Sequence, residues 1–135
     1  MPGRGGQQEE EDAEKLKFGP DFQEIRCLTN WEVGLILQHK LDSAQPGVVQ
    51  KNNFLKAYEY VNRVKRFKDK DKCEQARGEL ERLDLHEFEV AQLGNLLPEE
   101  VDEARMLIPS LSAEKVASEQ LKEVLEQLQT YRSYS

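Results

Sequence analysis

The segment that most constrains the fold of this chain is LHEFEVAQLGNLLPEEVDEARMLIPSL, residues 85–111. Apolar residues recur in it at three- and four-residue spacings on both sides of Pro98, which predicts two short helices. We expect the first helix over residues 86–96 and the second from Pro98 to residue 108, because proline is favoured at the first helical position. Pro109 disfavours the α conformation in the residue before it and so ends the second helix. The pattern predicts a helical hairpin.

Other segments of the chain also have helical patterns. The run Thr29-Asn30-Trp31-Glu32 forms a capping box, which predicts a helix from Asn30 to about Asp42. Further helices are predicted over residues 48–67, from residue 73 to about residue 82 after a charged break at 68–72, and from Ser118 onward. The fold class is therefore all-α.

The amino-terminal region lacks a helical pattern. Residues 1–14 are glycine-rich and then acidic, which is typical of a disordered tail. Leu16 and Phe18 alternate with polar residues, which favours a short extended segment whose ladder partner would come from another protein, since no other segment resembles a strand. The alternative is an irregular arm that lays Leu16, Phe18, Phe22 and Ile25 on the chain's own helices.

The helix predicted at 30–42 is apolar around most of its circumference, which indicates that it is covered on more than one side. The residues concerned are Trp31, Val33, Leu35, Ile36, Leu37 and Leu41. The whole chain is only 38% apolar and 33% charged, so little material remains to cover a second side. We therefore expect a partner protein on that side, and burial of both sides within this chain is the alternative.

Charge is distributed unevenly along the chain. The net charge is −7, which argues against a protein that wraps nucleic acid over its whole surface. The run RVKRFKDKDK nevertheless carries +4, so the rest of the chain carries −11. Its cations, a candidate nucleic-acid patch, are Arg63, Lys65, Arg66, Lys68, Lys70 and Lys72. The alternative is a set of solvated helix ends, where cations are favourable in any case.

No residue pattern predicts an active site, a metal site or a cofactor site. Cys27 and Cys73 stand apart in the sequence, and His39 and His86 are the only imidazoles, so a zinc site would need scattered ligands to converge. No nucleophile and base occur at a familiar spacing, and no glycine-rich phosphate loop is present. We expect a reduced intracellular protein that is not an enzyme, with no cofactor, no membrane segment and no small-molecule substrate.

The run EFEVAQLGNLLPEEVDEARMLIPSL resembles the fourth-subunit family of eukaryotic RNA polymerase II. The residues that carry the resemblance are Phe88, Glu89, Ala91, Leu93, Asn95, Leu96, Pro98, Glu99, Glu103, Leu107, Ile108, Pro109, Ser110 and Leu111. Residues 10–40 resemble the acidic start, the L-K-F segment and the first helix of that family, and the ending QLQTYRSYS resembles its closing helix and tail. The likeness covers nearly all of the chain after the first dozen residues.

The resemblance implies a non-catalytic subunit of nuclear RNA polymerase II, with shuttling to the cytoplasm left open. It implies a stalk heterodimer with the seventh subunit, attached to the polymerase core, that acts in initiation and contacts emerging RNA. It also implies three parts: a tail at 1–14, a partner-binding arm and first helix at 15–47, and a helicase-associated, HRDC-like helical domain at 48–135. The partner-binding residues that it implies are Leu16, Phe18, Phe22, Leu28, Trp31 and Leu35.

Two alternatives remain open. The first is a free-standing helical module that binds nucleic acid through the basic run 63–72. The second is the equivalent subunit of polymerase III or of an archaeal polymerase, although the LIPSL motif and the acidic start are more similar to the polymerase II form.

Overall fold

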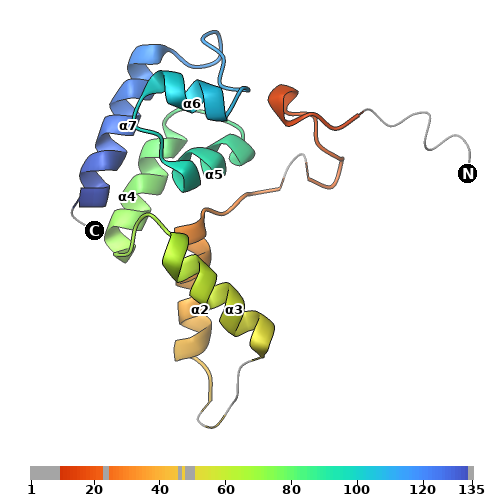
Figure 1. Cartoon of the computed structure of the whole chain (residues 1–135), viewed down its shortest axis with the longest axis vertical. Coiled ribbons are helices and arrows are strands. Elements are labelled where there is room, and N and C mark those ends of the chain that lie inside the picture. The colour runs from red at the N-terminus through yellow and green to blue at the C-terminus, as the bar shows by residue number, and fades with distance from the viewer. Residues whose placement is uncertain (1–9, 23–24, 46, 48–50, 134–135) are drawn as a thin grey trace, which may run out of the picture.

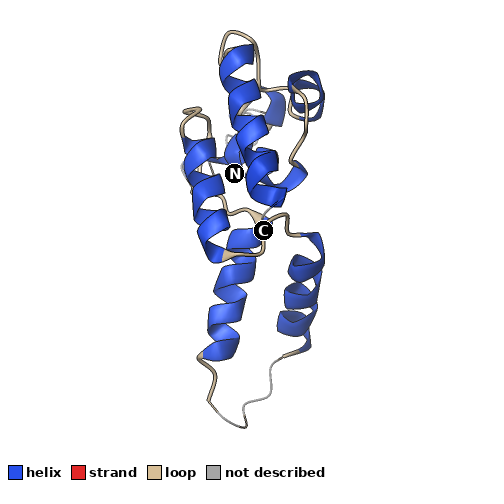
Figure 2. Ribbon diagram, turned by 90° about the vertical axis from the view of Figure 1, so that its left-hand side faces the viewer, coloured by secondary structure: helices blue, strands red, loops and turns tan. Residues whose placement is uncertain are grey.

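The computed structural model describes residues 10–22, 25–45, 47 and 51–133, and its helices form two parts (Figure 1). The elements are η1 (Ala13–Lys15), α2 (Asn30–Asp42), α3 (Asn52–Val64), α4 (Lys70–Glu81), α5 (Glu87–Leu96), α6 (Val101–Leu107) and α7 (Ser118–Ser133). Helices α4 to α7 form a bundle, and α2 and α3 form a hairpin that projects from one end of it (Figures 1 and 2). The described residues contain no β-strand, so the all-helical prediction is confirmed.

Local capping signals place the start of α2 where the sequence predicts it. The Thr29 hydroxyl accepts a hydrogen bond from the Glu32 backbone N–H, and the Glu32 carboxylate accepts one from the Thr29 backbone N–H, at 2.8 Å. A second capping box, formed by His86 and Glu89, begins α5 one residue after the predicted position. These boxes satisfy N–H groups that the first helical turn leaves unpaired.

The predicted start of α6 at Pro98 is wrong. Leu97 adopts a left-handed conformation with φ 47° and ends α5, and Glu100 is extended and precedes the first helical residue, Val101. Pro98 therefore belongs to the connection between the two helices, and its side chain is buried there. Helix α6 stops at Leu107, one residue before the predicted end, because Ile108 precedes Pro109 and is not helical.

The helix predicted over 48–67 is shorter in the structure. Helix α3 ends at Val64 because Lys65 is extended, with ψ 141°. Residues 48–50 of that prediction lie outside the described residues. The break predicted at 68–72 falls earlier, at residues 65–69, and within this connection Phe67 is fully buried. The connection between α3 and α4 therefore contributes to the core.

The core lies inside the bundle, where α4 packs against α5, α7 and α2, and α6 packs against α7. Its fully buried side chains include Phe67, Ala76, Leu80, Leu93, Ala104, Leu121, Val124 and Leu128. The apolar stripe predicted for α7 faces this core. Burial of one leucine side chain contributes roughly 1.5–3 kcal/mol, so the bundle holds most of the chain's apolar stabilisation.

Trp31 lies in this core as well, and not on the surface of this chain, where the resemblance implies a contact with a partner. Its side chain is 1% exposed and meets the Phe67 ring edge-on, with centroids 4.8 Å apart. A Cβ atom added to Gly94 of α5 would lie 2.6 Å from Cη2 of Trp31. The absence of a side chain at Gly94 is what lets the indole reach the α5 backbone.

The connection between α6 and α7 is held from α5 by a buried carboxylate. Glu89 is fully buried and accepts hydrogen bonds from the Ser110 hydroxyl, at 2.6 Å, and from the Lys115 ammonium group. A buried carboxylate is costly unless it is paired in this way. Glu89 thus serves both as a helix cap and as an anchor for the loop.

Arg105 of α6 holds the same connection from the other side. Its guanidinium group donates to the carbonyl oxygens of Leu111, at 3.0 Å, and Val116, at 2.9 Å, and to the Ser118 hydroxyl at 2.9 Å. Because three donors of one planar group are used, the loop has a fixed path although it contains no helix.

The amino-terminal arm, residues 10–22 and 25–29, contains no strand in this structure. Residues 12–17 form a tight turn with an isolated bridge between Asp12 and Lys17, and Leu16 is left-handed with φ 57°. Phe18 packs on the chain's own bundle, with its ring centroid 5.0 Å from that of Phe88 and 5.3 Å from that of His86. In this chain alone Phe18 lies on the bundle, as the second arrangement expects, whereas Phe22 and Ile25 stay exposed.

Candidate partner-binding and nucleic-acid surfaces

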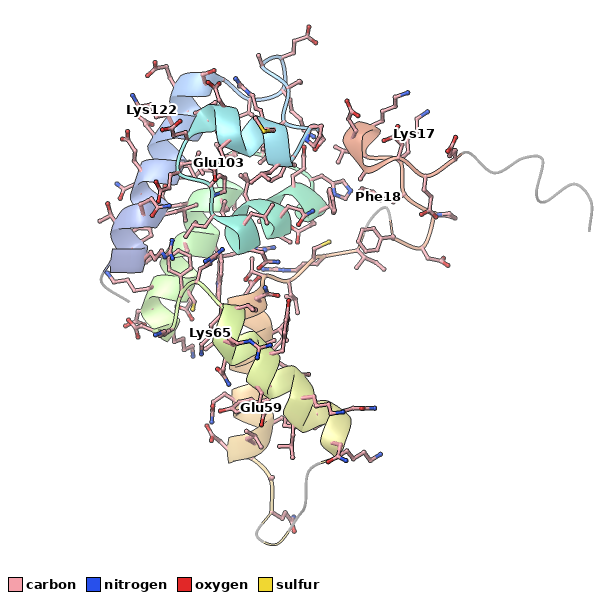
Figure 3. The ribbon with its side chains drawn as sticks, viewed as in Figure 1. Lys17, Phe18, Glu59, Lys65, Glu103 and Lys122 are labelled. Carbon is pink, nitrogen blue, oxygen red and sulfur yellow. The ribbon has the colours of Figure 1, made fainter. Side chains whose placement is uncertain are left out.

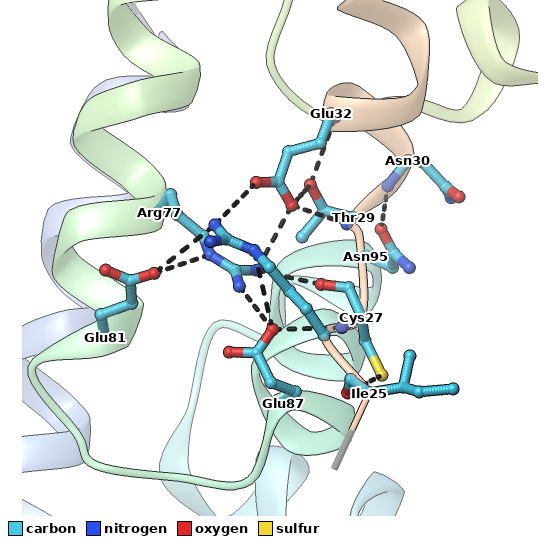
Figure 4. A network of polar contacts seen from close by, with 10 residues as sticks. Ile25, Cys27, Thr29, Asn30, Glu32, Arg77, Glu81, Glu87 and Asn95 are labelled. Atoms are coloured by element: carbon cyan, nitrogen blue, oxygen red, sulfur yellow. Dashed lines mark hydrogen bonds and ion pairs between the residues drawn. The ribbon is translucent and has the colours of Figure 1, made fainter. Parts of the chain in front are cut away.

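Arg77 of α4 lies where the arm, the hairpin and the bundle meet (Figure 4). Its guanidinium group donates to the carboxylates of Glu87, at 2.7 Å, Glu81, at 3.0 Å, and Glu32, at 3.3 Å. It also donates to the carbonyl oxygen of Cys27 at 3.3 Å, and its side chain is only 8% exposed. One buried cation thus joins α2, α4, α5 and the arm.

The electrostatics of this junction keep Arg77 charged. Burial by itself would lower the pKa of Arg77, since desolvation disfavours the charged form. The hydrogen bond with Glu87 and the charge of Glu32 outweigh burial and raise the pKa above its ordinary value. Arg26 lies 3.8 Å from Glu81 and 3.9 Å from Glu87, but it is largely exposed and contributes little.

The end of the arm is also bonded directly to α5. The Cys27 backbone N–H donates to the Glu87 carboxylate at 3.1 Å, and the Asn30 backbone N–H donates to the Asn95 side-chain oxygen at 2.7 Å. With the Arg77 contacts, these bonds fix the path by which the arm enters α2.

Large apolar side chains remain exposed along the arm and the hairpin. They are Phe22, Ile25, Leu28, Ile36, Leu55 and Tyr60, whereas those exposed in the bundle are Leu96, Met106 and Leu107. Within the described residues, two thirds of the exposed large apolar side chains thus lie in the smaller part of the molecule. A surface of this kind is typical of a protein–protein contact.

The structure places the predicted partner-binding residues differently from one another. Phe22 and Leu28 are exposed, and Leu16, Phe18 and Leu35 are half-buried, with Leu35 packed against the core. Trp31 is buried in this chain. The predicted set omits Ile25 and Ile36, which are 50% and 53% exposed. The outward direction of Ile36 follows from its place on α2 opposite the buried Gly34 and Trp31, which only the packed structure reveals.

Most of the predicted nucleic-acid patch gathers around one hollow of about 500 Å³ at the end of α3. Figure 3 labels one of its residues, Lys65. The hollow is lined by Arg63, Val64, Lys65, Arg66, Lys68 and Arg132. Arg66 donates through Nε to the carbonyl oxygen of Asn95 at 3.1 Å, which holds its guanidinium group in place. None of the described residues that line the hollow is acidic, so its charge is uniformly positive.

Two predicted members of the patch lie outside this hollow. Lys70 and Lys72 belong to the first turn of α4, where the Lys72 ammonium group lies over the Tyr131 ring, 5.6 Å from its centroid. Arg132, from the last turn of α7, is a member that the sequence analysis missed. No local signal links it to the basic run, because only the packing of α7 against α4 brings it there.

The two cysteines have different environments. Cys73 is buried, its thiol lies 3.7 Å from the carbonyl oxygen of Phe67, and burial raises its pKa to about 11. Cys27 is half-buried, and burial followed by the charge of Glu87 raises its pKa. In the part of the chain that the structure describes, no group of three His, Cys, Asp or Glu side chains is placed to hold a metal ion. Within the same ranges, no helix combines the length and apolar character needed to span a membrane.

Comparison with known proteins identifies relatives of this architecture. A sequence model of the family described as RNA polymerase Rpb4 matches residues 27–132. The chain is 44% identical over 109 residues to DNA-directed RNA polymerase II subunit 4 of Arabidopsis thaliana, which covers 77% of this chain and 79% of the relative. The matched range includes every helix from α2 to nearly the end of α7.

Two further relatives extend the match over almost the whole chain. DNA-directed RNA polymerase II subunit rpb4 of Dictyostelium discoideum is 33% identical over 150 residues, covering 98% of this chain and 96% of the relative. Subunit rpb4 of Schizosaccharomyces pombe is 34% identical over 132 residues, covering 93% of this chain and 94% of the relative. The arm is therefore included in the similarity, together with the hairpin and the bundle.

Proposed function

Because this chain belongs to the RNA polymerase Rpb4 family, we propose that it is a non-catalytic, nuclear subunit of RNA polymerase II that pairs with the seventh subunit to form the stalk. Together they act in initiation and transcript handling. The relatives described above carry the names of polymerase II subunits, which favours this function over a free-standing module and over polymerase III. The HRDC-like character of residues 48–135 is part of the same proposal.

The observation that carries the proposal is the apolar surface of the arm and α2. Phe22, Ile25, Leu28 and Ile36 are exposed, although the bundle buries its own apolar residues well. Such side chains on a chain that is one third charged favour a permanent partner. Leu16, Phe18 and Leu35 border this surface and belong to the proposed contact.

The arm has a defined starting state for this contact. The Phe18 ring packs at tilted angles against Phe22, Phe88 and His86, with centroids 5.0 to 5.3 Å apart, so the arm lies on the first turn of α5. Addition of a strand to the partner requires residues 12–17 to leave their turn, since a left-handed Leu16 does not fit a ladder. On binding, Phe18 would lose its contact with Phe88 and His86 and would gain a larger contact with the partner.

Co-expression with the seventh subunit, followed by size-exclusion chromatography, tests the proposal. We expect the wild-type chain to co-elute with that subunit in equal amounts. The double variant Leu28→Asp/Ile36→Asp should elute separately, because burial of two unpaired carboxylates costs several kcal/mol each, on the order of 2–5 kcal/mol.

The matched control is Met106→Asp/Leu107→Asp, which changes two exposed apolar residues of α6 in the same way. This variant should co-elute normally, and both variants should keep the far-UV circular dichroism of the wild type. Normal co-elution of the arm and α2 variant would show that the contact lies elsewhere. Failure of the wild-type chain to co-elute would refute the function itself.

A further inference from the structure

We propose that the basic hollow at the end of α3 is a binding site for single-stranded RNA, with Arg63, Lys65, Arg66, Lys68 and Arg132 holding the phosphates and Tyr60 stacking on a base. This site is separate from the apolar surface of the arm and α2. It does not depend on the partner assigned above, because every group in it belongs to this chain.

The geometry of the hollow distinguishes it from a run of helix-end cations. Its cations come from α3, from the connection after α3 and from α7, and they converge on one hollow of about 500 Å³. One of them is held in place, because Arg66 is bonded to the carbonyl oxygen of Asn95, and a second, Arg63, lies over the Tyr60 ring at 5.7 Å. Positively charged groups fixed before binding lose less entropy when a ligand binds.

The charge of the hollow contrasts with that of the chain. Five cations line it, while the whole chain carries −7. The last turns of α3 and α7 contribute about half a negative charge each, which neutralises only a small part of this charge. The hollow is therefore a local anion site on an acidic protein, and it attracts a phosphate chain to one position.

Tyr60 indicates that the anion is a polynucleotide. Its ring is 53% exposed and precedes Arg63 by one helical turn, so it lies on the same face of α3 as the hollow. An exposed aromatic ring beside cations is the arrangement with which proteins bind single strands, since bases stack on the ring while phosphates follow the charges. A phosphopeptide would use the cations and leave the ring without a role.

Fluorescence anisotropy with a labelled 12-nucleotide oligouridylate tests the site, with the full-length chain titrated at 50, 100 and 200 mM salt. We expect affinity to fall roughly 100-fold over this range, since each phosphate contact to a single strand adds about 0.7 to the salt slope. Lys65→Gln/Arg132→Gln should lower the slope by about 1.4 and weaken binding at least tenfold at 100 mM salt.

The matched control is Lys56→Gln/Lys122→Gln. These lysines are exposed, lie on α3 and α7 and give the same change of charge as the test variant. They do not line the hollow, and Lys122 lies towards the opposite end of α7 from Arg132 (Figure 3). This control should bind RNA almost as the wild type does. If both double variants lost the same affinity for RNA, the binding would reflect general charge attraction, and the proposal would be overturned.

Two further comparisons test the assignment of the ligand. Tyr60→Leu should weaken binding at least roughly fivefold, whereas Tyr60→Phe should preserve it, because stacking needs the ring and not the hydroxyl. A labelled serine-phosphorylated peptide of equal charge should bind more weakly than the RNA. Tighter binding of the peptide, or no effect of Tyr60→Leu, would refute a single-stranded RNA site. Unchanged circular dichroism confirms that each variant is folded.

Discussion

The bundle of α4 to α7 and the hairpin of α2 and α3 contain similar kinds of residues but bury them very differently. In the bundle, leucines such as Leu80, Leu93 and Leu128 are completely shielded from solvent. In the hairpin, α3 buries only Val61, and Ile36 is more than half exposed. The bundle therefore folds around its own core, while the hairpin presents apolar surface to the outside.

This difference separates stability from recognition within one short chain. The contribution of an apolar side chain to folding depends on the area it removes from water, so the bundle residues contribute most of the folding free energy. The exposed residues of the hairpin contribute little to folding and remain available for a partner. Substitutions can test whether the boundary between buried, stabilising residues and exposed, partner-binding residues lies where the structure places it.

The strongest test compares two residues of the same helix. Trp31 belongs to α2 but is buried in the bundle core, so Trp31→Ala should lower the free energy of unfolding by about 3–5 kcal/mol. Ile36→Ala, on the exposed side of α2, should cost about 0.5 kcal/mol or less. Urea unfolding monitored by circular dichroism measures both values. Similar costs would show that α2 is not divided between core and surface.

The second test breaks the junction between the two parts. Arg77→Met should lower the free energy of unfolding by about 2–3 kcal/mol, because it leaves three carboxylates close together without their cation. Hydrogen exchange of the Cys27 amide should also accelerate as the arm loosens. Arg82→Met, at the residue that follows α4, is the control, since Arg82 pairs at the surface with Glu79 and its loss should lower the free energy of unfolding by roughly 0.5 kcal/mol or less. Slow exchange at Cys27 in Arg77→Met would show that the arm is held by other contacts.

The third and smallest test uses two glycines. Gly94→Ala places a Cβ 2.6 Å from the Trp31 ring and should cost about 1–3 kcal/mol. Gly78→Ala on α4 meets no atom within 4 Å and should instead stabilise the protein by about 0.5–1 kcal/mol. The midpoint temperature of thermal unfolding should therefore fall in Gly94→Ala and rise in Gly78→Ala. A stabilising Gly94→Ala would mean that the hairpin does not approach α5 as closely as described.

The sequence predicted features that depend on neighbouring residues. The Thr29 capping box begins α2 as expected, because all of its residues lie within one helical turn. Helix α7 begins at Ser118, also as expected. The predicted start of α6 is wrong because Leu97 is left-handed and Glu100 is extended, and neither conformation has a sequence signal such as a glycine at position 97. Pro98 is compatible with a helix start but does not require one.

The sequence could not predict contacts that join distant parts of the chain. The position of Trp31 depends on a glycine in α5, and the basic hollow depends on Arg132 in the last helix. The apolar pattern of α2 predicts cover on more than one side, which stays a prediction for the side that carries Ile36, and the pattern could not indicate which residue faces inward. Only the packing of α2 against the bundle distinguishes Trp31 from Ile36.

Phe67 has a mechanical consequence for the hairpin. This ring stands in the short connection between α3 and α4 and is wedged against Trp31 at the base of α2, so both legs of the hairpin are fastened to the interior by aromatic rings. Any rotation of the hairpin relative to the bundle would have to separate these two buried rings. We therefore expect a partner bound to the hairpin to turn the bundle with it, as one rigid lever.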